Sequence, residues 1–223
     1  MTRNPSLKSI LRLFLFTLVV AALLFPASTN AASGVVYLPF VNKKAQHWPP
    51  PAPGNEILNP GFESGATGWT FFVDVGDSII DSSLARTGLN SAQLGIFVDQ
   101  LSPDPFEPSF LRTASVRQKV FVPPGKPLIQ FYQYVYSLEN HDPDTGQCYQ
   151  AEVLGDWVRV YLNFGLVDKF SLCDLFNSQG WTLRQYDLTG FEGRWIELKV
   201  EFKSDSTISS DYYLDDFSFV AVP

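Results

Sequence analysis

The stretch WIELKVEFK, residues 195–203, alternates apolar and charged side chains without a break after its tryptophan. The two alternating sets are Ile196, Leu198, Val200 and Phe202 on one side and Glu197, Lys199, Glu201 and Lys203 on the other. Successive side chains of a β-strand point to opposite faces of a sheet. The pattern therefore predicts a strand with one buried face and one face in water.

Similar short runs, rich in β-branched and aromatic residues, occur on both sides of this stretch. They occupy residues 91–97, 115–122, 128–136, 156–163, 166–172, 181–188 and 212–220. Turn-forming sequences such as VPPGKP (122–127) and TGFEG (189–193) separate them. Aromatic residues make up 15% of the chain, which also favours β structure. We therefore expect an all-β chain, a two-sheet antiparallel β-sandwich of the jelly-roll type.

The first 32 residues have the pattern of an export signal. Three basic residues precede an uncharged stretch at 13–25, and small residues suited to cleavage follow it. An uncleaved membrane anchor is the alternative, but 13 residues fall short of the roughly 20 that span a bilayer. We expect a signal peptide at 1–32, a secreted or cell-surface protein, and no stable membrane span after processing.

Two further segments complete the predicted domain organisation. Residues 33–55 contain the apolar GVVYLPFVN (34–42) and the start of a proline-rich connector, which would act as an extended spacer. Residues 56–223 would form the β-sandwich.

The charge of the chain excludes one class of partner. Without the leader's three bases, 13 lysines and arginines face 23 acids, a formal charge of −10. Nucleic-acid binding depends on basic patches that contact phosphates. We therefore expect no nucleic-acid partner.

Only two cysteines occur, Cys148 and Cys173, on either side of a predicted hairpin formed by 156–163 and 166–172. In an exported protein such a pair predicts a disulfide. Two buried free thiols are the alternative.

Carboxylates stand at both ends of the predicted sandwich. Glu63 lies among the turn-forming residues of ILNPGFESGATGW (57–69), and Asp215 and Asp216 interrupt the apolar last strand, YYLDDFSF (212–219). Carboxylates in an apolar strand are costly unless they are paired or bind a cation. First and last strands of a jelly roll are often neighbours, so these groups could meet at one rim and bind Ca²⁺, which prefers six to eight oxygen ligands.

Three motifs, NPGFESGATGW, ARTGLNSAQL (85–94) and YYLDDFSF, resemble the non-catalytic carbohydrate-binding modules of families 4 and 9 and their galactose-binding-like relatives. The resemblance covers roughly residues 56–221. It implies a structural Ca²⁺ where the three segments converge. The implied ligands are the backbone oxygens of Gly61, Thr87 and Ser91 and the side chains of Glu63 and Asp215. Between its two carbonyl donors, the middle motif has one residue more than in some relatives. The ligands assigned to Thr87 and Ser91 could therefore each lie one position away in the sequence. The alternative is that Glu63 and Asp215 only cap turns by hydrogen bonding.

Strand alternation also predicts an aromatic outer surface. It places Gln130, Tyr132 and Tyr134 of 128–136, and Trp157, Arg159 and Tyr161 of 156–163, outside the core. Large exposed aromatic patches usually mark binding sites. We predict that these six residues bind a glycan. The alternative is that the loops around 98–114 and 137–155 cover them.

Support for catalysis is weak. The chain has two histidines and lacks a Gly-x-Ser-x-Gly elbow and a phosphate-binding glycine loop. The acidic pair Asp142 and Asp144 lies in a turn. The sequence thus predicts a binding module that is no enzyme. A structural or adhesive surface domain is the alternative function, and a jelly-roll enzyme remains open by fold analogy alone.

Overall fold

The computed structural model describes residues 49–54, 56–74, 79–95, 112–150, 155–205 and 210–223. They all belong to one compact unit, Val35–Pro223. The other unit, Met1–Gly34, lies outside the described residues, as do the predicted signal peptide, the apolar segment 34–42 and the loop 98–111. Among the described residues, no helix has the length and apolar character needed to cross a membrane.

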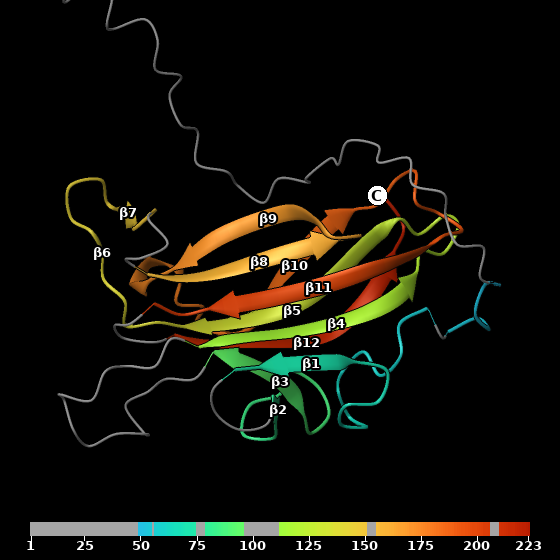
Figure 1. Ribbon diagram of the computed structural model, residues 1–223, viewed down its shortest axis with the longest axis horizontal. Coiled ribbons are helices and arrows are strands. Elements are labelled where there is room, and N and C mark those ends of the chain that lie inside the picture. The colour runs from blue at the N-terminus through green and yellow to red at the C-terminus, as the bar shows by residue number, and fades with distance from the viewer. Residues whose placement is uncertain (1–48, 55, 75–78, 96–111, 151–154, 206–209) are drawn as a thin grey trace, which may run out of the picture. The chain divides into compact units, whose positions relative to one another are not determined.

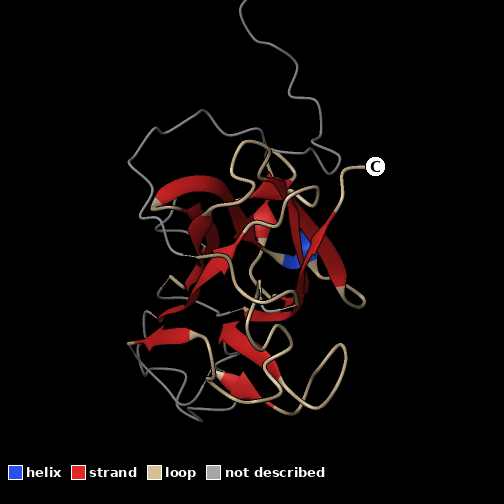
Figure 2. Ribbon diagram, turned by 90° about the vertical axis from the view of Figure 1, so that its right-hand side faces the viewer, coloured by secondary structure: helices blue, strands red, loops and turns tan. Residues whose placement is uncertain are grey.

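Twelve strands and one 3-10 turn make up the regular structure of the described chain (Figures 1 and 2). The strands are β1 (Thr70–Val73), β2 (Ile80–Asp81), β3 (Ser91–Gly95), β4 (Thr113–Phe121), β5 (Leu128–Tyr136), β6 (His141–Asp142), β7 (Gln147–Cys148), β8 (Asp156–Leu162), β9 (Gly165–Leu172), β10 (Thr182–Asp187), β11 (Trp195–Lys203) and β12 (Asp211–Val220). The 3-10 turn η3 spans Asp174–Phe176.

Two five-stranded antiparallel sheets lie one over the other (Figure 1). Sheet A has the order β1-β4-β11-β8-β9, and sheet B has the order β10-β5-β12-β3-β2. The small hairpin β6–β7 stands apart from both sheets. The predicted all-β, two-sheet sandwich is therefore confirmed.

The core fills the space between the inner faces of the two sheets. Strand β11 shows how the sequence specifies it, because its apolar residues are buried and its charged residues are only partly so. The inward residues of β5 and β12, among them Phe131 and Leu214, meet those of β4, β8 and β11 in one cluster. Phe62, from the segment before β1, is fully buried there against Trp69 and Phe217, with ring centroids 5.1 and 6.0 Å away. The sequence NPGFESGATGW is thus part of the core.

The sequence alternation located the long strands but missed the short ones. Strands β1 and β2, and the hairpin β6–β7, were not predicted; β2, β6 and β7 have two residues each, too few for a periodic signal. The predicted hairpin of 156–163 and 166–172 is present as β8 and β9.

The disulfide between Cys148 and Cys173 is confirmed. Their Cα atoms are 5.6 Å apart, and the bond joins β7 to the residue before η3. A bridge that closes a loop of this size stabilises a fold by roughly 3 kcal/mol in the loop-entropy model.

Candidate functional site

The six predicted ligand residues do not share one face. Strand β5, with Gln130, Tyr132 and Tyr134, belongs to sheet B, whereas β8, with Trp157, Arg159 and Tyr161, belongs to sheet A. All six point away from the core, as predicted, but on opposite outer surfaces of the sandwich. Alternation shows which side of a strand is buried and does not show which sheet the strand joins. The prediction of one joint site is wrong in this respect; whether any of the six binds a ligand stays a prediction.

On the outer face of sheet A, polar groups converge on Glu201 at the centre of the sheet. Arg159 Nη1 lies 3.5 Å and the Tyr161 hydroxyl 3.4 Å from Glu201 Oε1. The ammonium of Lys199 contacts Glu201 Oε2 and lies 5.2 Å from the centre of the Tyr161 ring. Register explains the grouping, because β11 pairs Lys199 with Tyr161 and Glu201 with Arg159. We call these four residues the Glu201 cluster.

Trp157 lies on the same outer face but is only 4% exposed. Lys169 of the neighbouring strand β9 stands 4.2 Å above the centre of its ring. Within the described chain, the indole Nε1 is buried and has no hydrogen-bond acceptor. A buried donor without a partner costs about 1–3 kcal/mol, so this position favours an additional oxygen from water or a ligand. The open aromatic surface predicted for Trp157 is not present.

The outer face of sheet A is basic in a chain that is acidic overall. Its described outward positions carry Arg117, Lys119, Arg159, Lys169, Lys199 and Lys203 against Glu197 and Glu201, an excess of four positive charges. Such a field attracts anionic ligands and raises their local concentration.

The outer face of sheet B holds the other three predicted residues in a different setting. The Arg86 guanidinium stacks on the Tyr132 ring at 3.4 Å. Gln185 Nε2 donates to Gln130 Oε1 at 2.9 Å, and Gln130 Nε2 donates to the hydroxyl of Ser218 at 3.0 Å. This face therefore combines aromatic rings with amides.

The three motifs of the predicted calcium site do converge at one rim of the sandwich. Phe217 N donates to the carbonyl of Pro60 at 3.1 Å, which joins the first motif to the last strand. A Cβ on Gly61 would lie 3.4 Å from Asp215 Oδ1, and a Cβ on Gly88 would lie 2.4 Å from Glu63 Cδ. Gly88 has φ +67°, so glycine is needed there both for the backbone conformation and for the approach of Glu63.

A bulge brings both adjacent aspartates of β12 to this rim. The register shifts between Asp215 and Ser218, and Asp216 has φ +52°, a conformation that Asp tolerates better than most residues. Asp216 then accepts hydrogen bonds from the Arg86 guanidinium and the Thr87 hydroxyl, each at 2.7 Å. The side chain of Ser91 donates to the carbonyl of Leu84 at 2.6 Å.

Backbone N–H groups already face the two predicted carboxylate ligands. Asp215 accepts from Arg86 N at 2.8 Å and from Thr87 N at 3.3 Å, and Glu63 accepts from Leu89 N and Asn90 N at 3.0 and 2.9 Å. Donors of this kind satisfy a carboxylate without a cation, so the geometry agrees with the turn-capping alternative. Burial, together with the charge of Asp216, raises the pKa of Asp215 to about 6. The calcium ligand set Gly61, Glu63, Thr87, Ser91 and Asp215 stays a prediction.

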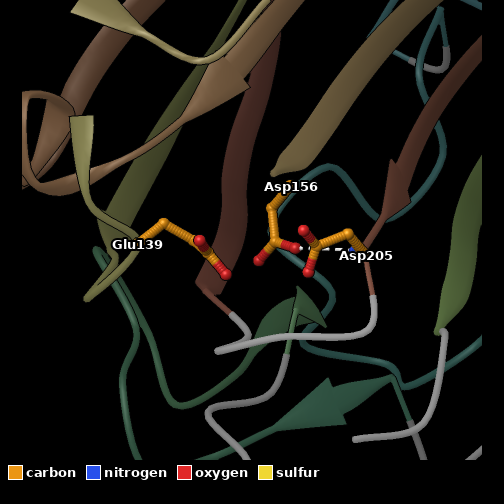
Figure 3. Close-up of side chains that lie close together, drawn as sticks. All are labelled: Glu139, Asp156 and Asp205. Atoms are coloured by element: carbon orange, nitrogen blue, oxygen red, sulfur yellow. Dashed lines mark hydrogen bonds between the residues drawn. The ribbon is translucent and has the colours of Figure 1, made fainter. Parts of the chain in front are cut away.

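A second acidic group, which the sequence analysis missed, lies at one end of the sandwich. Glu139 follows β5, Asp156 begins β8 and Asp205 follows β11, and their carboxylates lie within 4.8 Å of one another (Figure 3). All three are buried. Asp156 accepts from Asp205 N at 3.0 Å and from Ser210 N at 2.5 Å. Burial, together with the charge of Glu139, raises the pKa of Asp156 to about 7. These three residues could hold a metal ion.

The missed residues had little sequence signal. Glu139, Asp156 and Asp205 are 17 and 49 positions apart in the chain, so only the pairing of distant strands brings them together. Lys199 and Glu201 were recognised as outward but not as partners of Arg159, because the pairing of β11 with β8 is not encoded in either strand alone.

No protein-family model and no curated protein matches the chain. Solved structures of similar fold include a family 61 carbohydrate-binding module in complex with β-1,4-galactotriose, with TM-score 0.46 and 15% identity over 75% of this chain and 98% of that one. A family 16 carbohydrate-binding module has TM-score 0.41 and 20% identity over 74% and 99% of the chains. The K2 cleaved adhesin domain of Lys-gingipain has TM-score 0.41 and 17% identity over 72% and 96%. The assignment of this chain to families 4 and 9 stays a prediction.

Proposed function

We propose that the chain is a non-catalytic carbohydrate-binding module and that the outer face of sheet A binds the glycan. The observation that carries the proposal is the Glu201 cluster, where an acceptor and three donors meet beside an aromatic ring. Neighbouring sugar hydroxyls both donate and accept, so they can bond to Glu201 and to Arg159 or Lys199 together. Hydrogen bonds to charged groups are stronger than those between neutral groups.

A ligand can replace the contacts within the Glu201 cluster with little loss of interaction free energy. The contacts of Glu201 with Arg159 and Tyr161 are 3.5 and 3.4 Å long, at the weak end of hydrogen bonding. A hydroxyl placed between them would replace weak contacts with shorter ones. The Tyr161 ring and the aliphatic part of Lys199 offer an apolar surface for the C–H face of a sugar.

The basic character of this face supports a finer proposal. Four excess positive charges favour a glycan that carries carboxylate or sulfate groups over a neutral one. Export through the predicted leader would place the protein where such polysaccharides occur, secreted or at the cell surface.

A glycan array followed by calorimetry tests the proposal. We expect Arg159→Ala to weaken binding of the best glycan tenfold or more, about 1.4 kcal/mol. Gln185→Ala, on the other sheet, is the matched control and should bind like the wild type. If no glycan binds the wild type, the alternative function applies, a structural or adhesive domain that contacts other proteins.

We also propose that Ca²⁺ stabilises the fold. Two groups of carboxylates support this proposal, the predicted rim site with Glu63 and Asp215 and the buried group of Glu139, Asp156 and Asp205. The buried group favours a cation because three carboxylates lie within 4.8 Å of one another away from water, where their mutual repulsion is large.

A further inference from the structure

A row of aromatic rings crosses sheet B on its outer face. Trp181, just before β10, lies 5.9 Å from Tyr134 of β5, and Tyr134 lies 6.1 Å from Tyr213 of β12, measured between ring centroids. The register accounts for this row, since Tyr213 pairs directly with Tyr134. Tyr136, two residues along β5 from Tyr134, is 41% exposed on the same face. We call Trp181, Tyr134 and Tyr213 the ring row.

The ring row ends in a cluster of acceptors. Gln93 Nε2 donates to the Tyr213 hydroxyl at 2.8 Å and lies 3.4 Å from Asp211 Oδ1. Asp81 pairs with Ser91 of β3, two residues before Gln93, so its carboxylate belongs to the same end of the row. Burial and the charges of Asp211 and Asp81 raise the pKa of Tyr213. Asp211 also pairs with Tyr136 in the register of β12 and β5.

The charge of this face is opposite to that of sheet A. Its described outward positions carry Asp81 and Asp211, and at the rim Asp216 pairs with Arg86, which leaves an excess of two negative charges. An anionic glycan that fits the outer face of sheet A would be repelled here. A cationic ligand would be attracted both by the carboxylates and by the faces of the rings.

We propose that the outer face of sheet B is a second binding surface, for a glycan that carries protonated amino groups. Trp181 and Tyr134, which are partly exposed, would stack on the C–H faces of successive sugars, while Tyr213, 7% exposed, supports Tyr134 edge-on. Asp211 and Asp81 would pair with the ammonium groups. Gln93 would hold a hydroxyl beside them. This proposal does not depend on the function proposed for sheet A, because no residue of the ring row belongs to the Glu201 cluster.

Calorimetry of the full chain with a glucosamine tetramer, at low salt and a pH at which its amines are protonated, tests the proposal. We expect binding that Trp181→Ala weakens at least tenfold. Asp211→Asn keeps the size of the side chain and should reduce both the affinity and its dependence on salt. Arg159→Ala, on sheet A, should bind the tetramer as the wild type does, so loss of the sheet A site and loss of the sheet B site are distinguishable.

Two matched ligands separate the glycan from charge alone. The fully N-acetylated tetramer keeps the sugar rings and loses the charges, and it should bind at least tenfold more weakly. Tetralysine keeps the charges and lacks sugar rings, and it should also bind more weakly. The proposal is overturned if the acetylated tetramer binds equally well, if tetralysine binds as tightly as the sugar, or if the wild type does not bind the glucosamine tetramer.

Discussion

The two outer faces of the sandwich share a pattern of aromatic side chains but differ in charge and in exposure. On sheet A, Trp157 is covered by Lys169 and the surrounding positions are basic. On sheet B, Tyr134 and Trp181 are partly exposed and Tyr213 is buried, and Asp211 and Asp81 lie near the Gln93 end of the ring row. The difference teaches that an aromatic residue at an outward strand position does not define a stacking surface. Its neighbours on adjacent strands decide whether the ring is covered and which charge surrounds it.

The sharpest test of this contrast compares the two tryptophans. Trp157→Ala should destabilise the fold by about 3–5 kcal/mol, because it removes a buried aromatic side chain. Trp181→Ala should cost much less, about 1 kcal/mol, because Trp181 is only partly buried. Urea unfolding of both variants measures the difference. Equal stability losses would show that the two rings are buried alike.

Calcium removal distinguishes the two carboxylate groups. A ligand that binds only the folded state at a hundredfold excess over its Kd adds about 2.7 kcal/mol of stability. Chelation should therefore lower the melting temperature of the wild type. If the ion lies in the buried group, Asp156→Asn abolishes this response and Glu63→Gln keeps it; the reverse result assigns the ion to the rim. A wild type that melts identically with and without chelator contradicts the calcium proposal.

In the presence of chelator, the stability of the fold should depend on pH through Asp156. The pKa of Asp156 is about 7 in the folded state and is ordinarily 3.8. Between these two pH values Asp156 is protonated in the folded state and ionised in the unfolded state. Stability from this group is complete below about pH 4 and is lost as the pH rises to about 7, by up to about 1.4 kcal/mol per pH unit.

The matched pair of variants isolates this contribution. Asp156→Asn should remove the downward slope between pH 4 and pH 7, whereas Asp211→Asn should leave it in place, as measured by denaturant unfolding across that range. An unchanged slope in Asp156→Asn would mean that other groups cause the pH dependence.

The smallest expected effect concerns the ion pairs on sheet A. Lys199 and Glu201 contact each other at partly exposed positions, where such pairs contribute about 0–1 kcal/mol. Lys199→Ala should therefore change the free energy of unfolding by less than about 1 kcal/mol while it weakens glycan binding. A double-mutant cycle with Glu201→Ala measures the pair. A larger coupling would make the Glu201 cluster a structural element rather than one ready to exchange contacts with a ligand.

The sequence predicted the long strands well because each carries its own period-two pattern. Alternation in 195–203 matches the burial of β11 residue by residue. The predicted meeting of the first motif with the last strand is present too, through Pro60 and Phe217. For the site, the outward orientation of Tyr134 and Tyr161 was predictable, but their separation onto opposite faces was not.

By itself, the sequence determined that this chain forms a two-sheet sandwich, which side of each long strand is buried, and that its two cysteines bond. These properties depend on local periodicity and on residue chemistry. Only the tertiary structure decided which strands are neighbours, and with it the Glu201 cluster, the ring row and the buried carboxylates of Glu139, Asp156 and Asp205. The physical reason is that alternation repeats every two residues and is the same in every strand, whereas strand order depends on the combined packing of the whole core.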